Sequence, residues 1–437
     1  MRKQRHIKSG RRSVGRLTSC LALAATMALG GCDSLLEVTD PDLVVPANIN
    51  QSELFWAGAI GDFMDGVSSS DGMTVYVGLF TDEFQISGTF GTRIEVDERN
   101  IAITNPTMEG VFRDLQAARV GAENAAVLLT EEFGADSRIG EMNNLAGFTY
   151  VFFGEVYCSG VPYGSTVVGG GSENGLPTTT DETFALAIAR FDAAIAAADG
   201  ATEQVHMANI GKARAQLALG QFATAAATVA GVPSSFEYFI SHDQDADGGT
   251  NGIYSQNILQ QRWTVSDGEG VNGVLYRTAA DDRLPWEQDA SVVGFDALTP
   301  QFNQLNITSR GDNYPLATGL EAQLITAEAS LTSAPATWLG ILNTLRTDAS
   351  MPVLVDPGTV NGRVLMHFEE RAFWLYATGH RLGDMRRMVR HYGFTEGQVF
   401  PTGPHFKGSD YGTQMNFPIP EDETTNANFE ACLSTAA

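Results

Sequence analysis

Apolar residues recur at spacings of three and four along several parts of this chain, and such spacing predicts amphipathic helices. The clearest stripe runs from 365 to 389 and breaks at Gly379, a residue type that commonly separates two helices. Its apolar positions are Leu365, Phe368, Ala372, Leu375, Leu382, Met385 and Val389. The stretch 361–392 is therefore predicted to form two consecutive helices joined at a glycine turn.

Shorter stripes of the same kind indicate further helices that follow one another in pairs. They cover 54–63, 184–198, 210–217, 222–230, 316–331 and 338–345. Thr179 and Glu182 have the spacing of a capping box before one of these helices. Gly220, Phe222 and Ala225 stand at the offsets of a tetratricopeptide helix pair. We therefore predict a mainly α-helical fold built from tetratricopeptide-like helical pairs.

A long irregular region, Ser241–Asp289, separates the predicted helices and is rich in aromatic residues. Loops of this length in a compact protein are usually functional or disordered. Trp263 and Trp286 in this region are candidates for ligand binding, because flat rings suit the apolar faces of sugars. The alternative is that they are core residues, a role that we assign to Trp338 and Trp374 in the helices.

The first 31 residues have the three parts of a secretory signal peptide. Seven Lys or Arg and no acidic residue stand between positions 2 and 16, and a short apolar run follows from Leu17 to Ala28. That run is too short to span a bilayer. The ending Leu29–Cys32 is typical of a bacterial lipobox, so Cys32 is the predicted lipid-attachment site. We divide the chain into a signal peptide (1–31), a tether (32–50) and one helical domain (51–437).

The composition of the chain argues against several classes of function. Its 437 residues include 27 Lys and Arg against 52 Asp and Glu, a formal net charge of −25. A surface this acidic is unsuited to nucleic acid or anionic membranes. No nucleophile elbow, zinc-protease motif or Walker loop is present. Acidic pairs such as Glu369 and Glu370 are too common here to be singled out as catalytic. We expect neither an enzyme nor a cofactor.

Two further motifs fit a ligand site only in part. The stretch Asp243–Gly248 has aspartates at alternate positions, like the first half of a calcium loop, but Tyr254 stands where the bidentate Glu is needed. A solvated acidic loop is the preferred interpretation and calcium the alternative. The glycines of Gly268–Gly273 fit a dinucleotide fingerprint but lack the strand and helix that must flank it. We predict no metal site.

Two cysteines, Cys158 and Cys432, remain in the chain after the predicted signal peptide and Cys32. An exported protein meets an oxidising compartment, so these two residues are candidates for one disulfide. Two unpaired buried thiols are the alternative.

The charged residues around Gly379 and the proline-rich segment after them resemble those of the SusD/RagB family of outer-membrane nutrient-binding lipoproteins. The similar segments are Glu370–Arg371, Gly379–Arg387, Phe417–Glu423 and Asn426–Asn428, with Thr81–Phe84 and Tyr157–Tyr163 earlier in the chain. Thr378 departs from the family, which often has an acidic residue there. Closely spaced charges at a helix junction usually pair with one another and with helix ends. We therefore expect them to be structural.

The resemblance implies a scaffold of helical pairs that carries a loop-rich face, on a lipid-anchored protein at the outer-membrane surface. It implies capture of an oligosaccharide or peptide and a TonB-dependent, SusC-like transporter as partner. Phe84, beside an Asp-Glu pair, is a third and weaker candidate for ligand binding. Two other functions stay open: a helical-repeat adaptor that binds only another protein, and a surface hydrolase.

Overall fold

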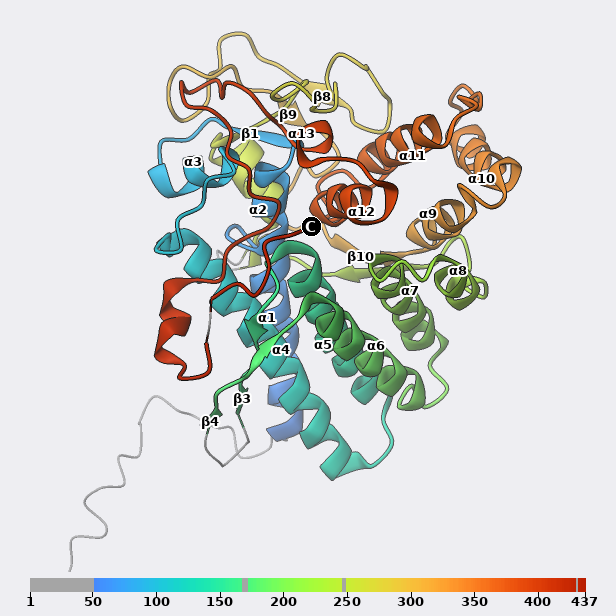
Figure 1. The fold of residues 1–437 in the computed structure, drawn as a ribbon. Helices are drawn as coiled ribbons and strands as arrows, with labels where there is room; N and C mark the ends of the chain where they lie inside the picture. Colours follow the sequence, from blue (N-terminus) through green and yellow to red (C-terminus); the bar gives the residue numbers. More distant parts are fainter. Residues whose placement is uncertain (1–50, 167–171, 246–248, 430) are drawn as a thin grey trace, which may run out of the picture. The chain divides into compact units, whose positions relative to one another are not determined.

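The computed structural model describes residues 51–166, 172–245, 249–429 and 431–437 (Figure 1). Asn50–Ala437 form one compact unit. The predicted signal peptide, Cys32 and the tether lie outside the described residues. Helices predominate in the described part of the chain, as the apolar stripes predict. None of the helices in these ranges is long and apolar enough to cross a membrane.

Three long helices near the start of the unit pack side by side. Asn105 caps one of them by accepting hydrogen bonds from the N–H groups of Thr107 and Met108, and Asp136 caps the next. That last helix is buried on nearly all sides, so it lacks a one-sided apolar stripe and the sequence pattern did not reveal it. The three are α1 (Gln51–Ser68), α4 (Pro106–Phe133) and α5 (Ser137–Val156).

Glycines allow α5 to approach its neighbour α6 (Thr180–Ala196) closely. A Cβ atom at Gly147 would come within 2.7 Å of the Phe191 ring, and one at Gly154 within 2.7 Å of the Phe184 ring. Protein interiors are close-packed, so neither position accepts a larger side chain without moving a ring. The two phenylalanines therefore set the spacing of α5 and α6.

The predicted helical pairs are present (Figure 1). α6 follows the expected capping box, in which Thr179 and Glu182 exchange hydrogen bonds. The turn after α11 contains Gly379 at φ +75°, a conformation that favours glycine. One predicted boundary is wrong, because residues 316–318 belong to a strand. The helices are α7 (Thr202–Ala218), α8 (Phe222–Val229), α9 (Gly319–Ser330), α10 (Pro335–Asp348), α11 (Val360–Trp374) and α12 (Arg381–Tyr392).

Short antiparallel strand pairs connect the loop segments. Figure 1 shows long connections gathered around β8, β9 and α13, which agrees with the expected loop-rich face. The pairs are β1 (Phe84–Ile86) with β7 (Trp263–Val265), β6 (Glu237–Ile240) with β10 (Tyr314–Thr318), β8 (Trp286–Glu287) with β9 (Asn303–Gln304), β2 (Val161–Pro162) with β5 (Pro177–Thr178), and β3 (Ser165–Thr166) with β4 (Ser172–Glu173). Short helices among them are α2 (Met73–Phe80), α3 (Gly91–Asp97), α13 (Glu396–Val399), the π-helix Tyr254–Leu259 and the 3₁₀-helix Glu421–Thr425.

Trp263 and Phe84 do not face solvent, so the prediction that they bind a ligand is wrong. Both side chains are fully buried. The Trp263 ring lies 5.6 Å from that of Tyr76 and 6.3 Å from that of Phe84. The pairing of β1 with β7 places Trp263 in the core, within a region that the sequence predicts to be irregular.

The C-terminal segment closes on the end of α5. The N–H of Phe417 donates to the carbonyl of Val156 at 2.7 Å, and the carbonyl of Phe417 accepts from the N–H of Cys158 at 3.0 Å. Cys158 is joined by a disulfide to Cys432, with Cα atoms 5.7 Å apart. The tail is therefore tied to the helical scaffold by backbone hydrogen bonds and by a covalent link.

Removal of this disulfide is expected to destabilise the protein. A link across 274 residues restricts the unfolded chain, an effect worth about 5 kcal/mol in the chain-entropy model, less any strain. The double variant Cys158→Ser/Cys432→Ser should unfold at a lower urea concentration than the parent. Thiol labelling of the unfolded, unreduced mature protein should find neither cysteine reactive. Two labelled thiols would show that the bridge does not form in the cell.

Candidate functional site

The residues predicted to bind a ligand do not come together in one site. Trp263 and Phe84 lie in the core, whereas Trp286 in β8 is half-buried. Its ring packs edge-on against Phe302 at 5.5 Å, and the Arg277 guanidinium lies 3.6 Å from the centre of the Phe302 ring. Trp286 alone remains a candidate for contact with a ligand.

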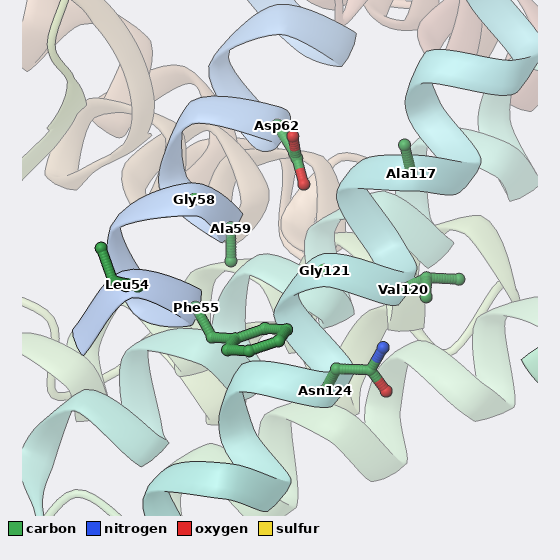
Figure 2. A pocket seen from close by; sticks show the side chains of 9 residues that line it. All are labelled: Leu54, Phe55, Gly58, Ala59, Asp62, Ala117, Val120, Gly121 and Asn124. Atoms are coloured by element: carbon green, nitrogen blue, oxygen red, sulfur yellow. The ribbon is translucent and has the colours of Figure 1, made fainter. Parts of the chain in front are cut away.

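A cavity of about 470 Å³ lies between α1 and α4 (Figure 2). Small and apolar side chains dominate its wall, and Phe55 is its single aromatic residue. Burial raises the pKa of Asp62, the one charged residue of the lining. Its lining residues are Leu54, Phe55, Gly58, Ala59, Asp62, Ala117, Val120, Gly121 and Asn124. This cavity offers few polar groups to orient a hydrophilic ligand.

A second cavity, of about 290 Å³, combines aromatic and polar side chains and is called the β6–β10 pocket below. Strands β6 and β10, the start of α9 and the turn between α11 and α12 form its wall. The lining residues are Ser234, Phe236, Glu237, Phe239, Pro315, Thr318, Leu320, Glu321, Trp374, Leu375, Thr378 and His380. Aromatic and apolar side chains with a few convergent polar groups are typical of a ligand pocket.

An irregular strand pair presents Phe239 to this pocket. Phe239 stands opposite Pro315, and the register of the pair shifts between Pro315 and Ala317. Proline has no N–H to donate, so it suits such an irregular position. Bulges of this kind often reorient a side chain beside a functional site. Phe239 is 40% exposed, which leaves its ring available for contact.

The start of α9 supplies the adjoining part of the wall. The Thr318 hydroxyl caps this helix by accepting the N–H of Glu321 at 3.1 Å. Gly319 lies directly against the preceding loop, where a Cβ atom would come within 2.3 Å of the Pro233 carbonyl oxygen. The pocket wall therefore requires glycine at this position.

Trp374, predicted from the sequence to be a core residue, is half-buried and lines the β6–β10 pocket. The Arg283 guanidinium lies 4.9 Å from its ring, within cation–π distance. Arg283 is held in turn by Asp281 and Glu370, at 2.7 and 2.8 Å. Trp374 is the last residue of α11. At a helix end, the spacing of apolar residues no longer predicts which side chains are buried.

Buried ionisable groups lie behind the pocket. His380 Nε2 lies 2.8 Å from an Arg214 guanidinium nitrogen and 3.1 Å from the carboxylate of Glu321. Burial, together with the Arg214 charge, lowers the pKa of His380, although the nearby Glu321 carboxylate acts in the opposite direction. His380 Nδ1 lies 2.8 Å from the Thr378 hydroxyl, which fixes the ring at the edge of the pocket.

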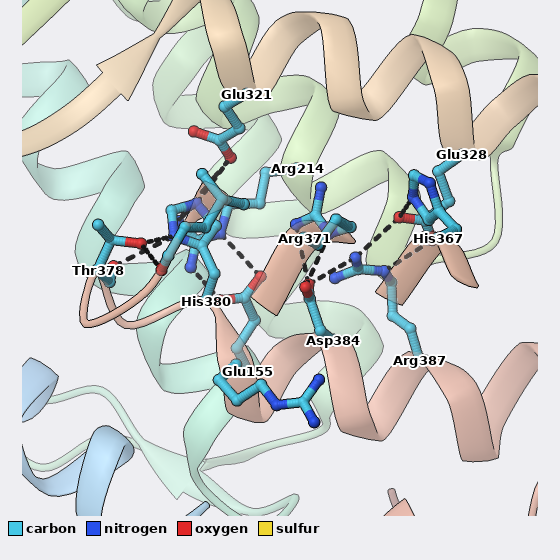
Figure 3. Close-up of polar contacts among 12 residues, drawn as sticks. Glu155, Arg214, Glu321, Glu328, His367, Arg371, Thr378, His380, Asp384 and Arg387 are labelled. Carbon is cyan, nitrogen blue, oxygen red and sulfur yellow. Dashed lines mark hydrogen bonds and ion pairs between the residues drawn. The ribbon is translucent and has the colours of Figure 1, made fainter. Parts of the chain in front are cut away.

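These groups continue into a network of buried ion pairs (Figure 3). Arg371 binds the Asp384 carboxylate with two hydrogen bonds, of 2.7 and 2.9 Å. Arg387 binds Glu328 in the same forked manner and also donates to Asp384 at 2.8 Å. Burial opposes ionisation of Asp384, but Arg371 and Arg387 outweigh it and lower its pKa to about 2.

Further pairs extend the network to distant parts of the chain. Arg381 binds Asp82 with hydrogen bonds of 2.7 and 2.8 Å, and Arg214 binds Glu155 with hydrogen bonds of 2.9 and 2.6 Å. Arg386 donates to backbone carbonyls at the end of α5. Part of this network carries the SusD/RagB resemblance, and its expected structural role is confirmed for Asp82, Arg371, Arg381, Asp384, Arg386 and Arg387. The ion pair between Asp82 and Arg381 links the upstream segment Thr81–Phe84 to the charged motif around Gly379.

Two groups of residues have features of a metal site. Asp243 and Asp245 of the partial calcium motif are described and form a local turn, in which the Asp245 N–H donates to Asp243 at 2.8 Å. Asp247 and Gly248 lie outside the described residues. The other group is buried and consists of Asp97, Glu269 and His405. None of the three lines the β6–β10 pocket.

Solved structures of SusD-like proteins share this fold. A SusD-like carbohydrate-binding protein from Bacteroides vulgatus is 15% identical, with a TM-score of 0.65 over 87% of this chain and 96% of that one. A SusD superfamily protein from Parabacteroides distasonis is 13% identical, with a TM-score of 0.65 over 88% and 100%. A laminarin-binding SusD-like protein is 14% identical, with a TM-score of 0.60 over 89% and 99%.

No family model and no curated protein matches the chain. The structural matches nevertheless cover nearly the whole length of both partners. The chain therefore has the fold of the SusD superfamily, and the resemblance seen in the sequence is confirmed at the level of the fold.

The variant Asp384→Asn is expected to lower the free energy of unfolding by about 3–5 kcal/mol, because it leaves Arg371 and Arg387 without a buried counter-charge. Acid should act in the same direction. The pKa of Asp384 is lowered from 3.8 to about 2, so its contribution is fully present above the ordinary value and is lost as the pH falls through about 2. Urea unfolding at pH 7 measures the effect of the variant.

Asp181→Asn provides the matched control, because Asp181 pairs with Arg390 at the surface and is 65% exposed. Exposed pairs contribute about 0–1 kcal/mol. Equal unfolding midpoints for the two variants would contradict a structural role for the buried network.

Proposed function

We propose that this protein is a lipid-anchored binding protein of the outer-membrane surface that captures a glycan and passes it to a TonB-dependent transporter. The fold supports this proposal, because it is shared with proteins described as carbohydrate-binding and laminarin-binding. The observation that carries it is the β6–β10 pocket, in which aromatic rings and polar groups converge. Fold alone leaves function open, so the site must support the assignment.

The pocket offers both kinds of contact that a sugar requires. Phe239 presents an exposed ring, and Phe236 and Trp374 add half-buried ones, on which the apolar face of a sugar can stack. Glu237 offers an exposed carboxylate that can accept hydrogen bonds from hydroxyl groups, and charge-assisted bonds are stronger than neutral ones. A volume of about 290 Å³ suits a short part of an oligosaccharide.

Binding is better supported than hydrolysis at this pocket. A glycosidase uses two carboxyl groups that flank the scissile bond. Glu321 is buried, 3.1 Å from His380 and 3.9 Å from Arg214, so Glu237 is the carboxylate of this lining that faces solvent. We infer that the pocket holds a sugar without cleaving it.

A different surface favours contact with a protein. Arg262 lies between the exposed rings of Phe90 and Phe295, 4.5 and 3.8 Å from their centres. Leu298, in the same loop as Phe295, is 83% exposed. Aromatic residues and arginine are enriched at protein interfaces. This surface is a candidate contact for the transporter or, if the protein is an adaptor, for its only ligand.

Phe239→Ala is expected to weaken glycan binding by about 1–3 kcal/mol, taking aromatic stacking on nucleic-acid bases as the nearest analogue. Its thermal stability should hardly change, because the ring is 40% exposed. Affinity electrophoresis against a panel of polysaccharides finds a ligand, and calorimetry with its oligosaccharides then measures the loss.

Phe295→Ala is the matched control, an exposed phenylalanine outside the β6–β10 pocket. It should leave glycan affinity unchanged. If Phe295→Ala abolished binding and Phe239→Ala did not, the sugar site would lie on the loop-rich face instead.

The anchor and the partner can be tested together. Cys32→Ala should prevent lipidation and release the protein from the membrane fraction, since stable anchoring requires more than one acyl chain. Cys20→Ala, also within the first 50 residues, should leave anchoring intact. Wild-type protein purified from detergent-solubilised membranes should bring a β-barrel transporter with it. Continued membrane attachment of Cys32→Ala would mean that another segment is the anchor.

A further inference from the structure

Three side chains that lie far apart in the sequence meet in the interior of the protein. Asp97 ends α3, Glu269 lies in the loop after β7, and His405 follows α13. One potential ligand atom of each lies within 4.8 Å of the other two. None of the three is more than 2% exposed. Helix, loop and C-terminal segment therefore converge on a single buried cluster.

Each carboxylate of this cluster has one oxygen bound and one oxygen free of hydrogen bonds. The Ile86 N–H donates to Asp97 Oδ2 at 2.9 Å, and the Tyr411 hydroxyl donates to Glu269 Oε1 at 2.7 Å. His405 Nε2 lies 3.0 Å from Asp97 Oδ2. In the described part of the chain, Asp97 Oδ1 and Glu269 Oε2 are buried without a hydrogen-bond partner. Buried unsatisfied acceptors in a native protein require an explanation, such as an ion.

The charge balance of the cluster also differs from that of most other buried carboxylates, the fully buried Glu83 being an exception without an Arg or Lys partner among the described ion pairs. Asp82, Glu155, Glu328 and Asp384 each form an ion pair with an arginine. Among the ion pairs between described residues, neither Asp97 nor Glu269 has an Arg or Lys partner. The nearby Arg99 is bound to the carbonyls of Pro401 and Gln414 and to Glu396. Buried charges are normally paired with a counter-charge or coordinate a metal.

We propose that Asp97, Glu269 and His405 bind a divalent transition-metal ion of the zinc or manganese class. One imidazole and two carboxylates form a ligand set that suits these metals, whereas magnesium and calcium prefer oxygen ligands throughout. A bound ion would compensate the two carboxylates and satisfy both unpaired oxygens. Because the cluster is fully buried, the ion would be structural.

Outer-shell groups are already in place around the proposed ligands. The Lys407 N–H donates to His405 Nδ1 at 3.3 Å, on the side opposite the proposed ligand atom Nε2, and the Glu98 carboxylate lies 3.7 Å from the same nitrogen, beyond hydrogen-bond distance. The Tyr411 hydroxyl orients Glu269 as an outer-shell group, in the way that second-shell hydrogen bonds commonly orient metal ligands.

Close backbone contacts hold the three segments together. A Cβ atom at Gly270 would lie 2.6 Å from the backbone nitrogen of Thr402, and one at Gly412 would lie 2.2 Å from the carbonyl oxygen of Arg99. The Gly412 N–H also donates to the Glu98 carbonyl at 2.7 Å. The residues that would bind the ion are therefore brought together by the fold itself.

Metal analysis of the purified protein tests this proposal directly. Protein expressed with added zinc and manganese and purified without chelators should contain about one of these ions per chain. Long dialysis against a chelator should lower the melting temperature, and zinc or manganese, but not magnesium, should restore it. Protein that contains neither metal and melts at the same temperature with and without them would overturn the proposal.

Glu269→Gln keeps the shape of the side chain and should abolish metal retention and the thermal response to metal. Glu83→Gln is the matched control, because burial raises the pKa of this fully buried carboxyl to about 8 and it is neutral at pH 7. This control should retain the metal.

If Glu269→Gln retains the metal as Glu83→Gln does, the metal is bound elsewhere and the proposed site is wrong. If Glu269→Gln fails to fold, the metal content and melting temperature of the wild-type protein still decide the outcome.

Discussion

The buried pairing of arginines with carboxylates at the junction of α11 and α12 holds this protein together. Removing such charges from water is energetically costly. Removing one partner of a buried pair therefore destabilises a protein much more than replacing both partners by apolar residues, because it leaves the other charge uncompensated. Here each arginine reaches a different element: Arg381 reaches the segment before β1, Arg386 the end of α5, and Arg387 reaches α9. The junction therefore fixes the position of elements that the chain order leaves far apart.

The pocket proposed to bind a glycan adjoins this junction. The β6–β10 pocket lies at the edge of the network, where His380 and Glu321 form part of its wall. Rigid backing matters for a binding site, because a preorganised pocket loses less entropy when a ligand enters. The motif that marks the family in the sequence thus supports the site from behind.

Asp97, Glu269 and His405 show a second way of accommodating buried carboxylates. The junction uses guanidinium groups, which supply several donors to each acid. The cluster offers a histidine and leaves two carboxylate oxygens without donors. Buried negative charge is therefore compensated in two ways in this fold. Arginines compensate it at the junction, whereas Asp97 and Glu269 require an ion or a proton.

The sequence by itself determined the helical pairs, the break at Gly379 and the structural role of the charged motif, because helical period, glycine conformation and local charge are short-range properties. Its predictions for three aromatic residues were wrong: strand pairing buries Trp263 and Phe84, and Trp374 at a helix end lines a pocket instead of the core. Only the tertiary structure brought together Phe239 with Trp374, and Asp97 with Glu269 and His405. Contacts between residues so distant in the chain leave no periodic signal, since they arise from the packing of whole elements.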